Sequence, residues 1–358
     1  MSHTETLLRM IGSPLLERVP ECDYVESEQL FRYAFRNNIE MLYLDVLAKR
    51  GHLNLLLDKQ VEIQARRCDT LKTVCRLSSV LQAGNIAHVV TKTLRPYPGT
   101  PNDIDCLYLG PLDRYEEVGR YLQSNRYRLT GPNPMQCEFF DELSEAEFNR
   151  DKAGGRFYID FYRELAADYM PYMDSSILAQ HVIRTSVDNC PNSVCVLAPI
   201  AEMVVLSLHS VLMHRIVPLE VFYTYAYVLS RMTEQEIVDL WRFTQENQAE
   251  PAMRTVLTLV ETLHERCFGV VPDKLAYLLA LSGRRNTEHV MLLKSGMQMP
   301  HVVKLTTFVI TVLSKIRGPR ARHGFLRELA HMANPTFTVE VLYHMLSKKF
   351  IDKHSDHV

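Results

Sequence analysis

The sequence is poor in several features that mark whole classes of protein. Its 358 residues include only 14 Gly, 17 Pro and one Trp, too little Gly and Pro for a collagen-like or low-complexity chain. No run of about 18 apolar residues occurs, so no membrane-spanning helix is expected. The first 21 residues contain no apolar segment of the kind found in secretory signals. We expect a soluble, cytoplasmic protein with no membrane partner.

Charge and cysteine usage exclude further classes. Lys and Arg total 40 against 42 for Asp and Glu, and this balance argues against a whole-molecule electrostatic dependence on nucleic acid. The eight cysteines form no CxxC pair and no Cys/His zinc spacing. We therefore predict reduced, buried thiols. The 47% hydrophobic content is ordinary for a folded chain, and the length suggests about two domains.

The periodicity of apolar residues predicts an α/β (α+β) fold with a small mixed sheet. Apolar residues at helical spacing cover 26–82, and three runs of strand character follow at 86–91, 103–109 and 156–162. Helical patterns dominate from about residue 199 onward, the later ones at 251–268, 272–282, 286–295, 300–316 and 336–351. The predicted organisation is an N-terminal helical region (1–82), a core containing the sheet (83–165) and a helical domain (166–358).

Three aspartates in the predicted strands are the main candidates for chemistry. Strand side chains alternate between faces, so Asp103 and Asp105 point the same way while Ile104 and Cys106 face a core. Asp160 lies in the third strand, and all three carboxylates converge if the two strands are neighbours. Adjacent carboxylates repel each other unless a cation lies between them, and Mg²⁺ prefers such oxygen ligands. The pattern suits metal-dependent phosphoryl or nucleotidyl transfer.

A purely structural interpretation of these aspartates stays open. Asp103 would then cap the turn that follows Pro101, Asp105 would face solvent, and Asp160 would pair with Arg156 or Arg163. An Asp-x-Asp pair by itself is a weak signal. The third aspartate and the turn-rich loop at 95–102 are what favour the functional interpretation.

Segment 71–165 resembles the nucleotidyltransferase superfamily of DNA polymerase beta, above all its uncharacterised prokaryotic nucleotidyltransferase branch. The helical segment 199–229, with His209 near its middle, is also similar to that branch. The resemblance covers roughly half of the chain and rests on short motifs. The matching motifs are Val89-Val90-Thr91-Lys92-Thr93, Tyr97-Pro98, Asp103-Ile104-Asp105 and Tyr158-Ile159-Asp160-Phe161-Tyr162.

The resemblance implies a nucleotidyltransferase-type sheet and an Mg²⁺-dependent (or Mn²⁺-dependent) transferase. Asp103 and Asp105 would bind the metal, and Asp160 would be a further ligand or the base toward the acceptor. A nucleoside triphosphate such as ATP would lie over Lys92 and Thr93 and release pyrophosphate as its nucleoside monophosphate moves to a hydroxyl acceptor. That acceptor would be a tRNA, a protein or a small molecule.

Two departures from the family pattern support a second hypothesis. Thr93 stands where the family has Gly, and Thr100-Pro101-Asn102 stands where an Arg usually precedes the acidic pair. Arg95 is then the only guanidinium near the pair in the sequence, and we assign it to the nucleotide site with Lys92 and Thr93. The alternative function is a catalytically silent binding or scaffolding module on the same fold.

A basic segment near the C-terminus offers a surface for an acceptor. We predict a loop here because Gly318-Pro319 interrupts the helical pattern. Its cations would contact an RNA backbone or the phosphates of a tRNA or protein acceptor, or they would only be solvated. A third, weaker hypothesis is an RNA-binding helical protein that uses this loop. The cations are Lys315, Arg317, Arg320, Arg322 and Arg327.

Two histidines in the later helical segment are not assigned to the site. His209 and His214 are five residues apart, and on an α-helix residues at this spacing do not share a face. We therefore predict packing or surface roles for them and no metal pair.

Overall fold

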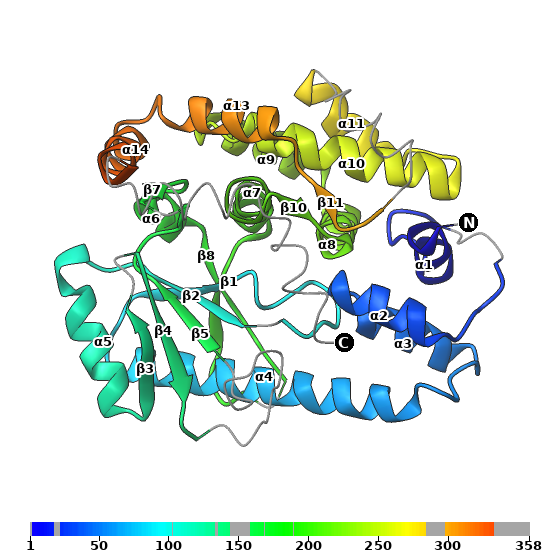
Figure 1. Ribbon diagram of the computed structural model, residues 1–358, viewed down its shortest axis with the longest axis horizontal. Coiled ribbons are helices and arrows are strands. Elements are labelled where there is room, and N and C mark those ends of the chain that lie inside the picture. Colours follow the sequence, from blue (N-terminus) through cyan, green and yellow to red (C-terminus); the bar gives the residue numbers. More distant parts are fainter. Residues whose placement is uncertain are drawn as a thin grey trace.

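A seven-stranded mixed sheet with helices on both faces organises the computed structural model of this protein (Figure 1). The structure describes residues 2–17, 22–101, 103–132, 135–143, 158–167, 169–188, 190–283 and 298–332. The expected mixed α/β class is confirmed.

The sheet has the strand order β3-β4-β5-β2-β1-β9-β8. Strand β2 runs parallel to β5 and β1 runs parallel to β9, while the other neighbours are antiparallel. The strands are β1 (His88–Thr91), β2 (Ile104–Tyr108), β3 (Tyr127–Pro132), β4 (Gln136–Asp141), β5 (Tyr158–Tyr162), β8 (Val182–Thr185) and β9 (Val194–Leu197). Two short ribbons pair β6 (Ala166–Ala167) with β7 (Met170–Pro171) and β10 (Ile216–Val217) with β11 (His301–Val302).

Helices surround the sheet in two groups. The first group precedes β3 and comprises α1 (His3–Ile11), α2 (Glu28–Arg36), α3 (Glu40–Lys49), α4 (Leu57–Ala83), the 3-10 turn η1 (Leu112–Arg114) and α5 (Tyr115–Ser124). The second group comprises α6 (Ser175–Leu178), η2 (Ala179–His181), α7 (Pro199–Leu208), the π-helical turn η3 (His209–His214), α8 (Leu219–Arg231), α9 (Glu234–Glu246), α10 (Glu250–Phe268), α11 (Asp273–Ser282), α13 (Leu305–Lys315) and α14 (Pro319–Met332).

Alternation along the strands divides the sheet into two faces. Ile104, Cys106 and Tyr108 of β2 pack in one hydrophobic cluster with residues of α4 and α5. Leu107 points to the opposite face, where a larger cluster joins the sheet to the helices α7–α10 and to α1–α3. Figure 1 shows α4 along one side of the sheet and α7 and α8 on the other. The face that carries Leu107 also carries the predicted aspartates.

Three of the seven strands of the sheet are predicted from the sequence, and four are missed. The strand predictions 86–91 and 103–109 correspond to β1 and β2, and the described part of 156–162 is β5. The sequence does not predict β3, β4 and β8, whose residues are mixed in polarity, or β9, which is apolar but only four residues long. The sheet takes β8 and β9 from beyond residue 165, at which the predicted core ends. The predicted helices 286–295 and 336–351 lie outside the described residues.

The prediction that all cysteines are reduced thiols is wrong for one pair. Cys75 of α4 and Cys190, which precedes β9, form a disulfide with their Cα atoms 5.5 Å apart. The two residues are 115 positions apart in sequence, so only tertiary folding brings them together. No helix in the described part of the chain is long and apolar enough to cross a bilayer.

The predicted break at Gly318-Pro319 is confirmed as a short turn over 316–318 between α13 and α14, but most of the basic segment 315–327 is helical rather than a loop. Lys315 ends α13 and is buried, with its ammonium donating to the carbonyl of Asn247 at 2.6 Å. Burial lowers the pKa of Lys315 to about 8. Arg320 pairs with Asp174 at 2.5 Å, while Arg322 is exposed on α14. Lys315 is therefore not part of the exposed surface that the sequence predicts, whereas the side chains of the four arginines, Arg317, Arg320, Arg322 and Arg327, are exposed.

Candidate functional site

The register of the sheet places polar residues of four strands in one row. Thr91 of β1 is opposite Asp105 of β2, Asp105 is opposite Asp160 of β5, and Asp160 is opposite Glu138 of β4. Directly opposite residues project their side chains from the same face. The strands that carry Asp105 and Asp160 are thus neighbours, as the convergence of the carboxylates requires. Glu138 extends the row and is not predicted from the sequence, because β4 itself is not predicted.

Burial and the neighbouring carboxylates make Asp103 and Asp160 hard to ionise. The pKa of Asp103 is raised to about 7, by burial first and then by the neighbouring Asp105. The pKa of Asp160 is raised to about 8, by burial first and then by Asp103 and Asp105. Within the described residues Asp160 makes no ion pair, and its carboxylate accepts a hydrogen bond from the Tyr162 hydroxyl at 3.3 Å. The nearby cations therefore do not fully neutralise the acidic groups of this row.

The turn after β1 holds Lys92 in an unusual backbone conformation. Lys92 has φ of 56°, in the left-handed region that non-glycine residues rarely adopt, and the Thr93 N–H closes the turn onto the Thr91 carbonyl at 2.6 Å. Such strain persists where surrounding contacts over-determine the conformation. Thr93 supplies one such contact, because its hydroxyl donates to the Thr91 carbonyl and accepts from the Asp105 N–H at 2.9 Å.

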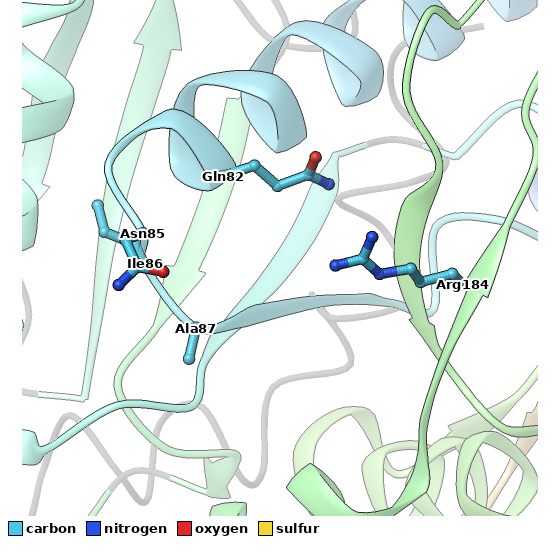
Figure 2. Close-up of a pocket in the computed structure, with 5 residues that line it drawn as sticks. All are labelled: Gln82, Asn85, Ile86, Ala87 and Arg184. Carbon is cyan, nitrogen blue, oxygen red and sulfur yellow. The ribbon is translucent and has the colours of Figure 1, made fainter.

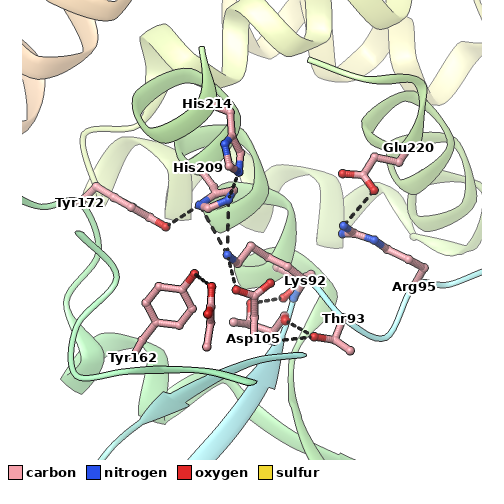
Figure 3. Close-up of polar contacts among 12 residues, drawn as sticks. Lys92, Thr93, Arg95, Asp105, Tyr162, Tyr172, His209, His214 and Glu220 are labelled. Carbon is pink, nitrogen blue, oxygen red and sulfur yellow. Dashed lines mark hydrogen bonds and ion pairs between the residues drawn. The ribbon is translucent and has the colours of Figure 1, made fainter. Parts of the chain in front are cut away.

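The Lys92 side chain is the centre of a buried polar cluster (Figure 3). Its ammonium lies 2.8 Å from Oδ1 of Asp105 and 4.9 Å from the centre of the Tyr162 ring. It also lies 3.5 Å and 3.4 Å from Nδ1 and Nε2 of His209. Burial is the largest single influence and by itself would lower the pKa of Lys92, but Asp105, Tyr172 and Asp103 together outweigh it and the net shift is upward. Lys92 is therefore a permanent cation in this site.

The prediction that His209 and His214 do not share a face is wrong. Both lie in the π-helical turn η3, where hydrogen bonds link residues five apart, so residues at this spacing are stacked along one side. Their Nε2 atoms are 2.8 Å apart, and Nδ1 of His209 contacts the Tyr172 hydroxyl at 3.1 Å. Burial, together with the nearby Lys92, lowers the pKa of His209 well below its usual value. A neutral His209 thus belongs to the site.

Glu202 holds the backbone of the same turn. Its carboxylate accepts the Lys92 N–H at 2.5 Å and the Thr91 hydroxyl at 2.8 Å. Glu202 and His209 are seven residues apart along α7 and η3, a spacing that puts both on the side facing the sheet. One helical segment therefore contacts Lys92 at its backbone and at its ammonium. The backbone N–H of Lys92, at the turn over which a triphosphate is expected, is thus bonded to a carboxylate in this structure.

Arg95 lies in the site and keeps one donor available. Its Nη2 atom pairs with Glu220 of α8 at 3.2 Å, and both side chains are nearly buried. Among the described residues, its buried Nη1 atom has no hydrogen-bond partner. A buried donor without a partner is costly, so this atom favours an anionic or carbonyl oxygen from a ligand.

A second guanidinium approaches the acidic pair from a distant part of the sequence. Arg66 of α4 is buried, and its Nη2 donates to the Pro101 carbonyl at 3.2 Å, two residues before Asp103. Burial lowers the pKa of Arg66, while Glu40, Glu62 and Asp103 act in the opposite direction. Arg95 is therefore not the only guanidinium near the pair. The sequence holds no signal for this contact, because it depends on how α4 packs.

The donor set suits a hard divalent cation. Asp105 and Asp160 offer carboxylate oxygens from one face of the adjacent strands β2 and β5, and Asp103 lies immediately before β2. The raised pKa values of Asp103 and Asp160 indicate that nearby cations do not fully compensate the negative charge there. In the described part of the chain no three His, Cys, Asp or Glu side chains are already gathered as a metal site. The Lys92 ammonium already donates a hydrogen bond to the Asp105 carboxylate.

A separate cavity lies at the other end of β1. It has a volume of about 290 Å³ and is lined by Gln82, Asn85, Ile86, Ala87 and Arg184 (Figure 2). Ala87 immediately precedes β1, whereas Lys92 immediately follows it. No predicted site residue lines this cavity.

The fold and the site together define a mixed α/β protein with an acidic row beside a buried lysine. A scan against protein-family models and a search of the curated proteins found no match for this chain. The resemblance to nucleotidyltransferases therefore rests on the motif residues and not on a family match.

The raised pKa of Asp160 predicts that this acid destabilises the fold at higher pH. The native state binds more protons than the unfolded state between the ordinary value of 3.8 and about 8, so stability falls as pH rises through this window. Asp160→Asn removes the charge, and we expect the free energy of unfolding at pH 8 to rise by about 2 kcal/mol without divalent cations. Urea denaturation of both proteins at pH 4 and pH 8 measures this.

The gain should be absent at pH 4, where the native Asp160 is already neutral. Asp113→Asn, at an exposed position in η1, is the control and should change little at either pH. Equal stability of wild type and Asp160→Asn at pH 8 would show that Asp160 is not held in a strained, ionised state.

Proposed function

We propose that this protein is a divalent-metal-dependent nucleotidyltransferase that moves a nucleoside monophosphate from a nucleoside triphosphate to a hydroxyl acceptor. The observation that carries the proposal is the placement of Asp105 and Asp160 opposite each other on neighbouring strands, with Asp103 immediately before β2, beside two buried cations, Lys92 and Arg95. The sheet would then be of the nucleotidyltransferase type. Carboxylates for a metal and cations for phosphates are the two needs of this chemistry.

Mg²⁺ or Mn²⁺ would be held by Asp103, Asp105 and Asp160, and it would neutralise their charge and polarise the phosphate oxygens. Asp160 would be a further ligand or the base: its pKa is raised to about 8 without a metal ion, and a bound cation would favour the ionised carboxylate that can accept the proton of the acceptor hydroxyl. The hydroxyl oxygen forms its bond to the α-phosphorus, and the bond to the leaving pyrophosphate breaks. The unpaired Nη1 of Arg95 would bind a phosphate oxygen.

The acceptor surface differs from the one that the basic segment suggests. Lys315 is buried, and Arg320 is exposed but paired with Asp174, which leaves Arg317, Arg322 and Arg327 as exposed cations without that pairing. A tRNA or protein acceptor would therefore meet at most part of the proposed cation set. A small-molecule hydroxyl needs none of it.

Calorimetric titration with each of the four nucleoside triphosphates in Mg²⁺ tests the proposal. We expect wild type to bind one of them. The double variant Asp103→Asn/Asp105→Asn should bind it at least about 100-fold more weakly, because each substitution removes a charge that the metal needs. Asp113→Asn is the matched control, with an exposed aspartate outside the row. Circular dichroism establishes that each variant is folded. If folded wild type binds no nucleoside triphosphate, the transferase proposal fails.

A catalytically silent binding or scaffolding module is the second candidate, and Glu202 favours it. The Glu202 carboxylate accepts hydrogen bonds from the Lys92 N–H and the Thr91 hydroxyl, and the Thr93 hydroxyl donates to the Thr91 carbonyl. A triphosphate over this turn would find an anion already in place. Nucleotide binding without pyrophosphate release, with a panel of hydroxyl acceptors, would support this candidate against the transferase.

A further inference from the structure

The Lys92 ammonium occupies the position in which a cation meets Asp105. Its Nζ atom is 2.8 Å from Oδ1 of Asp105, and both side chains are buried. In the described part of the chain, no other ammonium or guanidinium pairs with this carboxylate. The same Nζ lies at nearly equal distances, 3.5 Å and 3.4 Å, from the two ring nitrogens of His209. The ammonium therefore contacts both the charged Asp105 carboxylate and the neutral His209 ring.

We propose that Lys92 is a resident counter-ion that a divalent cation displaces from Asp105, and that His209 then receives its ammonium. This rests on the proposed function in one respect, which is the divalent cation at Asp103, Asp105 and Asp160. It adds that the cation does not enter an open site, because it must first move a lysine.

Electrostatics requires the displacement. A hard divalent cation seeks the carboxylate oxygens of Asp105, the group to which Lys92 donates. A lysine ammonium and a divalent cation on one carboxylate would repel each other strongly in a buried site of low dielectric. Replacement of Lys92 by a neutral side chain should therefore strengthen metal binding, whereas a lysine that only bound phosphates would not affect it.

The π-helical turn supplies the second position for the ammonium. Its geometry stacks His214 behind His209, and the 2.8 Å contact between their Nε2 atoms fixes the His209 ring beside Lys92 (Figure 3). A neutral imidazole carries a lone pair, and the Tyr172 hydroxyl next to it carries two more. Both are acceptors for an ammonium that leaves Asp105. His209 is thus a positioning residue that acts through Lys92.

Binding of Mn²⁺, followed by the electron paramagnetic resonance signal of the free ion, tests the proposal without any nucleotide. Lys92→Met should bind Mn²⁺ about tenfold or more tightly than wild type, and Lys92→Met/Asp105→Asn should lose this gain. His209→Ala should weaken binding severalfold in wild type and have no effect in the Lys92→Met background. Lys274→Met, a lysine whose ammonium donates to the Ser230 carbonyl, is the control and should bind as wild type does.

A second measurement does not depend on the folding of any variant. Reductive methylation of wild type by formaldehyde and cyanoborohydride, read at each lysine by mass spectrometry, should label Lys92 faster when Mn²⁺ is present, because the ammonium has lost its carboxylate. Lys315 is an internal standard, since it is also buried but donates to the Asn247 carbonyl. Its labelling should not respond to the metal.

The outcomes separate this proposal from the proposed function. If wild type binds Mn²⁺ and Lys92→Met binds it equally or more weakly, displacement is overturned while the metal site stands. Unchanged Lys92 labelling in saturating Mn²⁺ overturns it as well. If neither wild type nor Lys92→Met binds Mn²⁺ at millimolar concentrations, the metal-dependent function fails and this proposal fails with it.

Discussion

Asp105→Ala is expected to lower the free energy of unfolding by about 3–5 kcal/mol, because it leaves the buried Lys92 ammonium without its carboxylate. The loss comes from desolvation of an uncompensated charge more than from the value of the ion pair itself. Removal of both charges together should therefore cost much less than the two single changes predict. For Lys92 and Asp105, the double variant separates the desolvation cost from the energy of the ion pair.

Urea denaturation of Asp105→Ala, Lys92→Met and Asp105→Ala/Lys92→Met in EDTA measures the coupling. We expect the double variant to be more stable than the sum of the single losses by at least about 2 kcal/mol. Asp113→Ala is the control, and its exposed position predicts a change within about 0.5 kcal/mol. Additive losses would mean that Lys92 and Asp105 do not depend on each other.

Cys75→Ser is expected to destabilise the protein by about 4–5 kcal/mol, because the disulfide with Cys190 closes a segment of 115 residues. The link restricts the unfolded chain, and such restriction grows with the length of the closed segment. It connects α4, which lies on one face of the sheet, to the segment before β9. Reduction of the wild type should have a similar effect.

Thiol titration and urea denaturation test this together. Of the eight cysteines, the six that are not paired should react in denaturant when the oxidised protein is unfolded. Cys68→Ser, an exposed and unpaired cysteine on the same helix α4, is the matched control and should leave stability almost unchanged. Eight reactive thiols in the oxidised protein would contradict the disulfide.

The prediction of strands from sequence succeeds for β1, β2 and β5 and fails for β3, β4, β8 and β9. In β2 and β5 the alternation of buried and acidic residues is visible directly, because both strands pack one face against α4 and α5. Strands β8 and β9 carry partly exposed residues and join the sheet across a sequence gap, so local patterns do not reveal them. A strand at or near an edge has a weaker hydrophobic requirement than a central one.

The candidate site shows the same division. The shared face of Asp103 and Asp105 follows from the period of two in a strand, and their approach to Asp160 needs only that β2 and β5 be neighbours. The contacts of Lys92 with His209 and Glu202 span more than 100 residues and depend on the docking of α7 against the sheet. The pairing of His209 with His214 needs a π-helical turn, and the spacing of these residues argues against contact on an α-helix.

By itself, the sequence determined the class of the fold, the two central strands with their acidic pattern, and the helical character of the flanking regions. Those features depend on local periodicity and on the burial of apolar side chains, which neighbouring residues encode. Tertiary structure alone decided which charges meet: Lys92 with Asp105, Arg95 with Glu220, and Arg66 beside Asp103. Charged side chains carry no periodic signal of their partners, because a buried ion pair depends on distance in space and not on separation in sequence.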